Sequence, residues 1–234
     1  MKAKLNLPPL IFTPPPVQTQ PTADLASRQP ELARQMKQLP SPLLRPDANP
    51  PGYQGMQQVG FITQEHAGFL LHAGGNDFFI HAKRREGGNQ GEFQGDKLHL
   101  SIAPDRLAAG FELLAPMLFS EDSPIDKWKI TDLAKAPMES RVAKGAQLTL
   151  YIKPAQEDGA YQADELNKIR HLVENIEQTL SRHAIPVGER PDSDIAPHHW
   201  QFTSYRNEFH SDREENAAQS GRLHEEPIYQ LLTE

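Results

Sequence analysis

Three short segments of this chain alternate strictly between apolar and polar residues, and this alternation restricts the fold more than any other feature. They are DKLHLSI at residues 96–102, DKWKI at 126–130 and LTLYIK at 148–153. Because a β-strand points successive side chains to opposite faces, each segment predicts a strand with one buried and one exposed face. We therefore expect a sheet with one wet face, as antiparallel sheets often have.

The rest of the chain from about residue 56 supplies further strands and two helices. Turn residues separate expected strands at 59–63, 68–73 and 77–83, and the segments 127–132 and 146–153 extend two of the alternating stretches. Apolar residues at helical spacing predict helices over 104–119 and 163–183. After Pro186 we expect loop-like stretches, the segment WQFTSYRNEF without an assigned type, and a short C-terminal helix. Without a steady βαβ rhythm, the class is α+β: one compact domain with a mixed, largely antiparallel sheet flanked by helices.

The N-terminal quarter has a different character, because twelve of the 21 prolines lie in the first 51 residues. Proline fixes φ and lacks a backbone donor, so this arm forms neither a regular sheet nor one long helix. We expect a flexible segment at 1–20, a partly helical Pro-rich linker at 21–55 and the domain at 56–234. The helix in the linker is predicted over 27–39, with Pro30 in its first turn and Leu32, Met36 and Leu39 on one face.

Composition excludes several kinds of protein. The chain has no cysteine, which removes disulfides, thiolate zinc sites and cysteine nucleophiles. A net charge of −7 argues against nucleic-acid binding, and no apolar run approaches the roughly 18 residues of a membrane span. Pro8 and Pro9 interrupt the apolar stretch that a Sec signal peptide needs.

Metal and nucleotide sites are not expected either. The stretch PHHW (His198, His199) puts adjacent histidines on different sides, and HEEP (His224, Glu225, Glu226) lacks a second histidine one turn later. The glycine-rich EGGNQGEFQGDK does not match GxxxxGK[ST], so we read it as a loop and expect no cofactor.

The alternating strands carry an unusual set of residues on their polar faces. Lys97 pairs with His99, Lys127 with Lys129, and Tyr151 with Lys153, each two positions apart. If the strands are neighbours with the same orientation, one face gathers these residues. Lysine is an ordinary occupant of a wet face. Two observations favour a binding face instead: hardly any acid balances these cations, and Lys, His, Tyr and Arg are the residues that bind phosphate and move protons. A phosphorylated ligand is the natural counter-charge.

Five blocks of the sequence resemble a known family. GDKLHLSI, LFSEDSPIDKWKITD, LYIKPAQE, SYRNEF and EEPIYQLLTE are similar to the phosphothreonine lyase effectors of bacterial type III secretion systems. The likeness covers nearly all of residues 55–234 and touches LNLPPL near the start. It implies that the chain inactivates host MAP kinases irreversibly, as a secreted virulence factor. The family acts by β-elimination on the phosphothreonine of the pThr-x-pTyr activation loop, which leaves dehydrobutyrine and needs no metal.

The resemblance also implies roles for individual residues. Lys129 matches the general base that removes the Cα proton, and His99 matches the general acid for the leaving phosphate. A free lysine is neutral in only about one molecule in a thousand near pH 7.4. Lys127, about 7 Å away along the strand, repels the Lys129 charge by roughly 2.4 kcal/mol at an effective dielectric near 20, whereas Asp126 and a bound phosphate oppose this effect.

The resemblance assigns substrate binding to several other cationic residues and one tyrosine. The phosphothreonine phosphate is expected to contact Lys97, Arg141, Arg206 and Arg213. Tyr151 is expected to orient Lys129 or a substrate carbonyl, and Lys153 to meet the phosphotyrosine phosphate. Lys127 is counted among the substrate-binding residues. The family carries an arginine pair where this chain has Lys83 and Arg84, which puts an arginine-fork contact at position 83 in doubt.

The arm resembles a kinase docking motif. Lys2 and Lys4 precede Leu5 and Leu7, a basic and Φ-x-Φ pattern that suits an acidic patch and an apolar groove. The partners implied are host MAP kinases phosphorylated on Thr and Tyr, with a type III secretion chaperone as a candidate, and the chain is expected to be a monomer delivered into the host cytoplasm and nucleus. The alternatives are a phosphopeptide-binding module without turnover and a metal-independent phosphatase.

Overall fold

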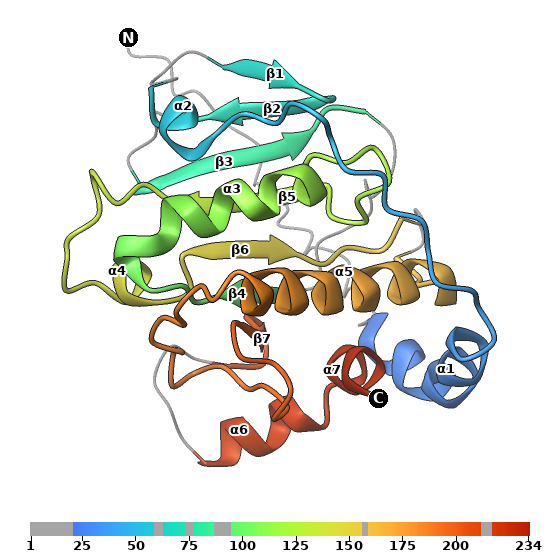
Figure 1. Cartoon of the computed structure of the whole chain (residues 1–234). Coiled ribbons are helices and arrows are strands. Elements are labelled where there is room, and N and C mark those ends of the chain that lie inside the picture. The colour runs from blue at the N-terminus through green and yellow to red at the C-terminus, as the bar shows by residue number, and fades with distance from the viewer. Residues whose placement is uncertain (1–20, 59–62, 74–76, 87–94, 156–158, 212–216) are drawn as a thin grey trace, which may run out of the picture.

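The computed structural model describes residues 21–58, 63–73, 77–86, 95–155, 159–211 and 217–234, and the account of the structure is limited to these. Their strands form one seven-stranded sheet in the order β1-β2-β3-β5-β6-β4-β7, and every pairing in it is antiparallel. The helices α3 and α5 lie across one face of this sheet (Figure 1). The α+β class and the single domain are confirmed, although the sheet is antiparallel throughout rather than mixed.

The strands agree closely with the alternating segments. They are β1 (Gln64–His66), β2 (Phe69–His72), β3 (Phe79–Arg84), β4 (Asp96–Leu100), β5 (Lys127–Thr131), β6 (Leu148–Tyr151) and β7 (Thr203–Asn207). The strand expected at 59–63 falls almost wholly outside the described residues. The strands β1 and β7 have no predicted counterpart.

The helices are α1 (Pro21–Met36), α2 (Tyr53–Gln57), α3 (Leu107–Leu118), α4 (Arg141–Lys144), α5 (Ala163–Arg182), α6 (Ala217–His224) and α7 (Pro227–Thr233), with a 3₁₀ turn at Pro104–Arg106 before α3. None of the described helices is long and apolar enough to cross a bilayer.

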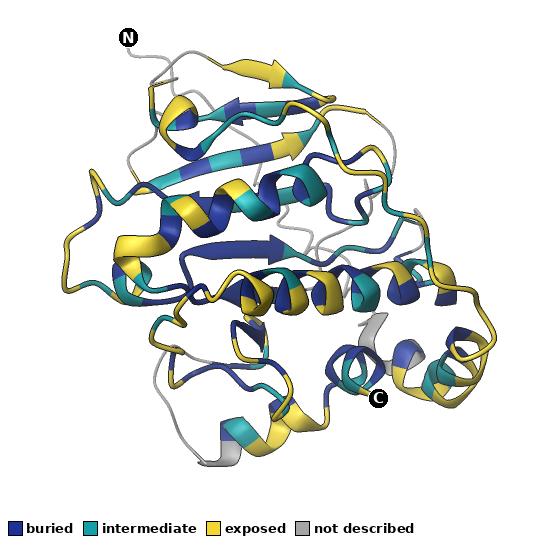
Figure 2. Cartoon of the chain, in the orientation of Figure 1, coloured by how far each residue is buried: buried dark blue, intermediate teal, exposed yellow. Residues whose placement is uncertain are grey.

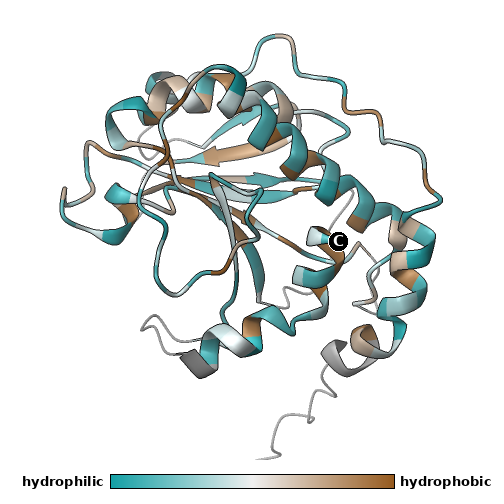
Figure 3. Cartoon of the chain, turned by 60° about the horizontal axis from the view of Figure 1, so that its bottom comes forward, coloured by the Kyte–Doolittle hydropathy of each residue, from teal (hydrophilic) through white to brown (hydrophobic). Residues whose placement is uncertain are grey.

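Helix α5 is built as its sequence predicts. Gln162 and Glu165 form a capping box at its start, which satisfies two backbone donors of the first turn. Its apolar side chains face the sheet and are buried: Leu166, Ile169, Val173, Ile176 and Leu180. Each such burial contributes roughly 1.5–3 kcal/mol, while the outward side of the helix is hydrophilic (Figure 3).

The core fills the space between the helices and one face of the sheet. Leu98, Trp128, Ile130, Leu148 and Leu150 point into it from the central strands, and each is at most 1% exposed. Strand β6 is buried along most of its length (Figure 2). The alternating polar residues of the same strands therefore lie on the opposite face of the sheet.

Helix α1 differs from its prediction. It runs over Pro21–Met36 instead of 27–39, so Pro30 stands inside the helix rather than in its first turn, and Leu39 lies beyond its end with 37% exposure. Leu25, Leu32 and Met36 are buried, and α1 packs against α5 and α7. The helix ends before Pro40, because proline disfavours a helical conformation for the residue that precedes it.

Strand β4 is anchored at its start by a buried carboxyl group. Asp96 Oδ1 accepts hydrogen bonds from the Tyr205 hydroxyl at 2.5 Å and from Asn207 Nδ2 at 3.1 Å. Burial raises the pKa of Asp96 to about 7, against the hydrogen bonds of these two partners, which lower it. The first residue of β4 is thus fixed to β7 on the face of the sheet that carries the core.

Candidate active site

A row of side chains crosses the polar face of the three central strands. Lys129 of β5 pairs with Thr149 of β6, and Thr149 pairs on its other side with His99 of β4. Directly paired residues of antiparallel strands share a face, so the three side chains are neighbours. Two strand spacings separate Lys129 from His99, or about 10 Å between their Cα atoms.

A second row runs beside the first. Lys83 of β3 pairs with Lys127 of β5, whose Nζ lies 4.5 Å from the centre of the Tyr151 ring. Tyr151 pairs with Lys97 of β4, and Lys97 with Arg206 of β7. The expectation that three neighbouring strands gather their polar residues on one face is met by this register.

A cleft of about 740 Å³ opens over these rows. It is lined by Phe78, Phe79, Lys97, His99, Lys129, Ser140, Arg141, Val142, Ala146, Thr149, Arg206, Glu208, Phe209 and Ser211. The cleft thus brings together Lys129, His99 and three of the predicted phosphate-binding residues. Phe78 and Phe209, 40% and 66% exposed, give it an apolar rim.

The pKa of the Lys129 amine is lowered, which favours its neutral form. Burial lowers the pKa of Lys129 most, Lys97 adds to this effect, and Asp77 opposes it. The expected repulsion from Lys127 is present but ranks below both burial and Lys97 among the causes that lower this pKa. Lys129 Nζ lies 3.7 Å from the centre of the Phe79 ring, which holds the side chain over the sheet.

Asp126 does not act on Lys129 as expected. It precedes Lys127 on the strand, and its carboxylate is buried in an ion pair with Arg84, with 2.6 Å between Arg84 Nε and Asp126 Oδ1. Arg84 also lies 4.4 Å from the centre of the Phe69 ring. The negative charges that oppose the lowering of the Lys129 pKa come instead from Asp77 and Glu208.

The imidazole of His99 is held in place by the buried carboxylate of Asp194. Its Nδ1 lies 2.6 Å from Asp194 Oδ2, and both side chains are almost fully buried. A ring nitrogen facing a carboxylate carries a proton, so Nε2 is the nitrogen left for the cleft. Burial lowers the pKa of His99, whereas the charge of Asp194 and its hydrogen bond raise it. The pKa of Asp194 is lowered because His99 and Arg141 outweigh its own burial.

Asp194 also connects His99 to the two arginines that line the cleft. Its Oδ1 accepts from Arg141 Nη2 at 3.2 Å, and its Oδ2 from the Ser204 hydroxyl at 2.8 Å. The Ser193 hydroxyl donates to Asp194 Oδ1 at 3.0 Å and accepts from Arg206 Nη1 at 3.1 Å. One carboxylate therefore orients His99 and steadies both arginines.

The polar face holds more negative charge than the strands alone suggested. Lys97 forms an ion pair with Glu208, the residue that follows β7. Asp77 opens the segment expected as a strand at 77–83 and lies before β3, while Asp194 and Glu208 come from outside the strands. A count on the three alternating segments therefore omits all three. A phosphate that binds Lys97 must displace or share this contact.

Lys153 lies apart from the described lining of the cleft, in a group with Lys83 and Lys127. Burial lowers the pKa of Lys153, and Lys83 and Lys127 lower it further. Tyr151 has its pKa raised to about 12 by burial, and its ring contacts Lys127. The expected role of Tyr151 toward Lys129 or a carbonyl stays a prediction.

Some predicted residues lie outside the described part of the chain. These are Arg213 and the four docking residues Lys2, Lys4, Leu5 and Leu7. Within the described residues, no group of three or more His, Asp or Glu side chains is arranged to hold a metal ion.

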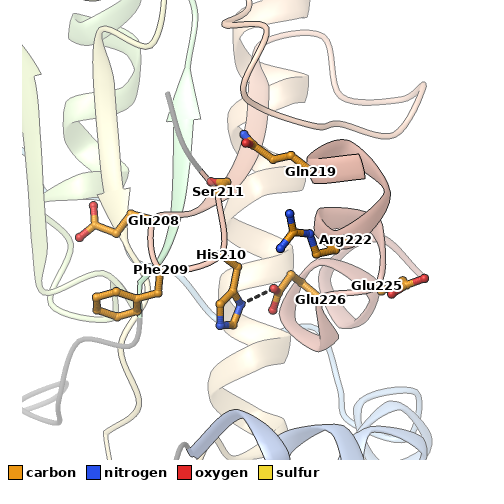
Figure 4. A pocket seen from close by; sticks show the side chains of 8 residues that line it. All are labelled: Glu208, Phe209, His210, Ser211, Gln219, Arg222, Glu225 and Glu226. Carbon is orange, nitrogen blue, oxygen red and sulfur yellow. Dashed lines mark hydrogen bonds and ion pairs between the residues drawn. The ribbon is translucent and has the colours of Figure 1, made fainter. Parts of the chain in front are cut away.

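A second hollow, of about 460 Å³, adjoins the cleft and shares Glu208, Phe209 and Ser211 with it. Figure 4 shows His210 and Glu226 facing one another there, with 2.5 Å between His210 Nδ1 and Glu226 Oε1. Three glutamates line this hollow, which disfavours a phosphate dianion. The cationic cleft is therefore the better candidate site.

Sequence analysis missed three residues that line the cleft, Thr149, Glu208 and Phe79, and the buried Asp194 that contacts His99. The alternation that selected Tyr151 places Thr149 on the same face two positions earlier, so a signal for it existed. Asp194 lies 95 positions from His99 in an irregular segment, and no local pattern connects the two.

Comparison with known proteins finds relatives over most of the chain. The family model described as OspF/SpvC matches residues 1–234. The MAPK phosphothreonine lyase of Salmonella typhimurium is 44% identical over 203 residues, which cover 87% of this chain and 84% of that protein. The phosphothreonine lyase OspF of Shigella sonnei is 43% identical over the same shares.

Solved structures of similar sequence have the same fold. A phosphothreonine lyase solved to study its catalytic mechanism superposes with a TM-score of 0.89 at 41% identity, covering 93% of this chain and 100% of that one. The VirA (SpvC) phosphothreonine lyase effector of Chromobacterium violaceum gives 0.88 at 42% identity, over 91% and 99% of the two chains.

Proposed function

This chain belongs to the OspF/SpvC family and is a phosphothreonine lyase, and on that premise we propose that its substrate is the doubly phosphorylated activation loop of a host MAP kinase. The reaction is β-elimination at the phosphothreonine of a pThr-x-pTyr sequence. The product is dehydrobutyrine, which has no hydroxyl group to be phosphorylated again. The kinase is thereby inactivated irreversibly.

One observation carries this proposal: a lysine with a lowered pKa and a carboxylate-held histidine flank the same floor residue in a cationic cleft. An elimination needs a base at Cα and an acid at the ester oxygen, two bonds further along. The tips of Lys129 and His99 approach the cleft from either side of Thr149, which suits these two positions.

The steps follow from the groups in the cleft. The neutral Lys129 amine takes the Cα proton, the electron pair forms the Cα–Cβ double bond, and the Cβ–O bond breaks. His99 gives the proton on Nε2 to the departing phosphate oxygen. Lys129 ends as an ammonium and His99 as a neutral imidazole, and exchange with solvent restores both.

The cations of the cleft stabilise the charge that gathers on the leaving group. Lys97, Arg141 and Arg206 line it together, and we include Arg213 in this set on the family resemblance. Donors that are already in position before the reaction stabilise a developing charge without a cost of reorganisation. The phosphate dianion in turn favours the charged form of His99, so substrate binding loads the acid.

The phosphotyrosine is assigned to the group of Lys83, Lys127 and Lys153. Burial and, after it, repulsion by Lys83 and Lys127 lower the pKa of Lys153, and a second phosphate relieves this repulsion. A doubly phosphorylated peptide should therefore bind better than one with phosphothreonine alone. Loss of this preference is expected for Lys153→Ala; a Lys153→Ala variant that keeps the full preference removes Lys153 from the assignment.

The biological setting is part of the same proposal. The chain acts as a monomeric effector delivered by type III secretion into the host cytoplasm and nucleus, with a secretion chaperone as a candidate partner. Residues 1–20 serve as secretion and docking segment, and Lys2, Lys4, Leu5 and Leu7 bind the kinase away from its activation loop. Residues 21–55 connect this segment to the catalytic domain.

The deciding experiment is mass spectrometry of a doubly phosphorylated activation-loop peptide after incubation with the protein in EDTA. A lyase yields a residue one water lighter than threonine and leaves the phosphotyrosine intact. A metal-independent phosphatase yields threonine, and a binding module leaves the peptide unchanged. Either of these two results refutes the proposal.

A further inference from the structure

Thr149 stands between Lys129 and His99, the expected base and acid, and the proposed mechanism gives it no part. It pairs with Lys129 on one side and with His99 on the other, and it lines the cleft. The residue as a whole is only 3% exposed, and within the described part of the chain its hydroxyl makes no hydrogen bond to another residue. A hydroxyl that lines a cleft and has no protein partner is available to a bound molecule.

The shape of the floor supports this reading. Lysine and histidine are long side chains, and the threonine between them is short, so a recess forms above Thr149. When Cα faces Lys129 and the ester oxygen faces His99, the Cα–Cβ–O unit of the substrate spans this recess. The Thr149 hydroxyl then lies beneath the middle of this unit, beside the Cβ–O bond that breaks.

A threonine on a strand needs no functional explanation, because β-branched residues are favoured there. The same sheet offers a direct comparison: Thr203 of β7 is fully buried on the core face, and its hydroxyl also lacks a partner among the described residues. Thr203 pairs with the apolar Leu100 and does not line the cleft. Of these two threonines, Thr149 is the one that stands between Lys129 and His99.

We propose that Thr149 is a catalytic residue whose hydroxyl donates a hydrogen bond to the phosphate of phosphothreonine as it leaves, an inference that rests on the proposed function. The bond strengthens as charge moves from the Cα–Cβ unit onto the phosphate oxygens. It therefore acts on the chemical step more than on binding. Removing one such donor slows an enzyme by about 10- to 100-fold.

The test compares two substitutions that separate the hydroxyl from the shape of the side chain. Thr149→Val keeps the volume and removes the donor, and we expect kcat to fall about 10- to 100-fold with KM changed by less than about threefold. Thr149→Ser keeps the donor and should retain most of kcat. The control Thr203→Val should retain the wild-type kcat, since that hydroxyl faces the core.

Several results overturn the inference. A Thr149→Val variant within about twofold of the wild-type kcat does so, as does a Thr149→Ser variant as slow as the valine variant. A purely structural role would lower the melting temperature and would not be rescued by serine. If Thr149→Val does not fold, Thr149→Ser and Thr149→Ala give the same comparison, because they differ only in the hydroxyl.

The same assay separates this inference from the proposed function. A wild-type protein that forms no dehydrobutyrine overturns the lyase on MAP kinase peptides, and the role of Thr149 with it. A wild-type protein that forms dehydrobutyrine, together with an equally fast valine variant, overturns the role of Thr149 alone.

Discussion

Replacing Asp194 by asparagine tests how the acid is kept protonated. Asp194→Asn retains the shape of the side chain and an oxygen that accepts from His99 Nδ1, but it removes the negative charge 2.6 Å from the ring. The carboxylate raises the pKa of His99 against burial, so its loss lowers that pKa. At a given pH fewer molecules then carry the proton that the leaving phosphate needs.

The size of the effect follows from the geometry. Opposite charges with centres about 4 Å apart attract by ~4 kcal/mol at an effective dielectric of 20, which is equivalent to a pKa change of about three units at most. The bound phosphate and the solvent replace part of this attraction, so we expect the pKa of His99 to decrease by about one to two units in Asp194→Asn. At pH 7.5 kcat should fall about 10- to 100-fold.

The assay is a pH–rate profile with a doubly phosphorylated peptide, in which dehydrobutyrine is quantified by mass spectrometry. The descending limb, where His99 loses its proton, should move to lower pH in Asp194→Asn. Because Arg141 also contacts Asp194, a second comparison is needed. In a His99→Asn background the further change Asp194→Asn should cost little, since its effect acts through the imidazole.

The reasoning is refuted if Asp194→Asn keeps both its rate and its descending limb. It is equally refuted if the Asp194 substitution costs as much in the His99→Asn background as in the wild type, because Asp194 would then act through the arginines instead.

Three further predictions concern the base, the arm and the fold. Lys129→Ala should abolish dehydrobutyrine formation while peptide affinity, measured by calorimetry, stays within a few-fold of wild type; a near-normal rate would remove Lys129 from the mechanism. Deleting residues 1–20 should reduce kcat/KM on an intact kinase more than on a short peptide, and an equal effect on both would contradict docking. The buried Asp96 has a pKa raised to about 7, so the folded state binds its proton more tightly than the unfolded chain. This contribution to stability is complete below about pH 4 and is lost as pH rises through 7, on the order of a few kcal/mol. Urea unfolding should show this decrease in the wild type and not in Asp96→Asn; an identical pH dependence in both would exclude Asp96 as its source.

The sequence was sufficient for the elements whose period is strong. Alternation in 96–102 and 126–130 predicted the faces of β4 and β5, because burying Leu98 and Trp128 leaves Lys97 and Lys129 only the other side. Helix α5 was equally clear, since an apolar residue recurs at every turn. The family resemblance then assigned chemistry to positions that alternation had only grouped.

The other parts of the fold and of the site depend on contacts between residues far apart in sequence, which local patterns do not predict. Strand β7 has five buried residues, mostly polar, so its segment lacks the alternation that identifies a half-buried strand. Asp194 and Glu208 enter the site from irregular segments, and their pairing with His99 and Lys97 is set by the tertiary fold. Burial, which lowers the pKa of Lys129 more than Lys127 does, is likewise a property of the folded protein.

The strand order has a consequence for how activity arises during folding. Strand β4 meets β7 only after 111 residues of chain have been enclosed, and it meets β6 across about half that span. Contacts so distant in sequence form late, because the entropy of closing the loop precedes any gain from them. A chain whose sheet is only partly formed therefore has an incomplete active site, because Arg206 lies on β7. We therefore expect catalysis only after β7 has paired with β4.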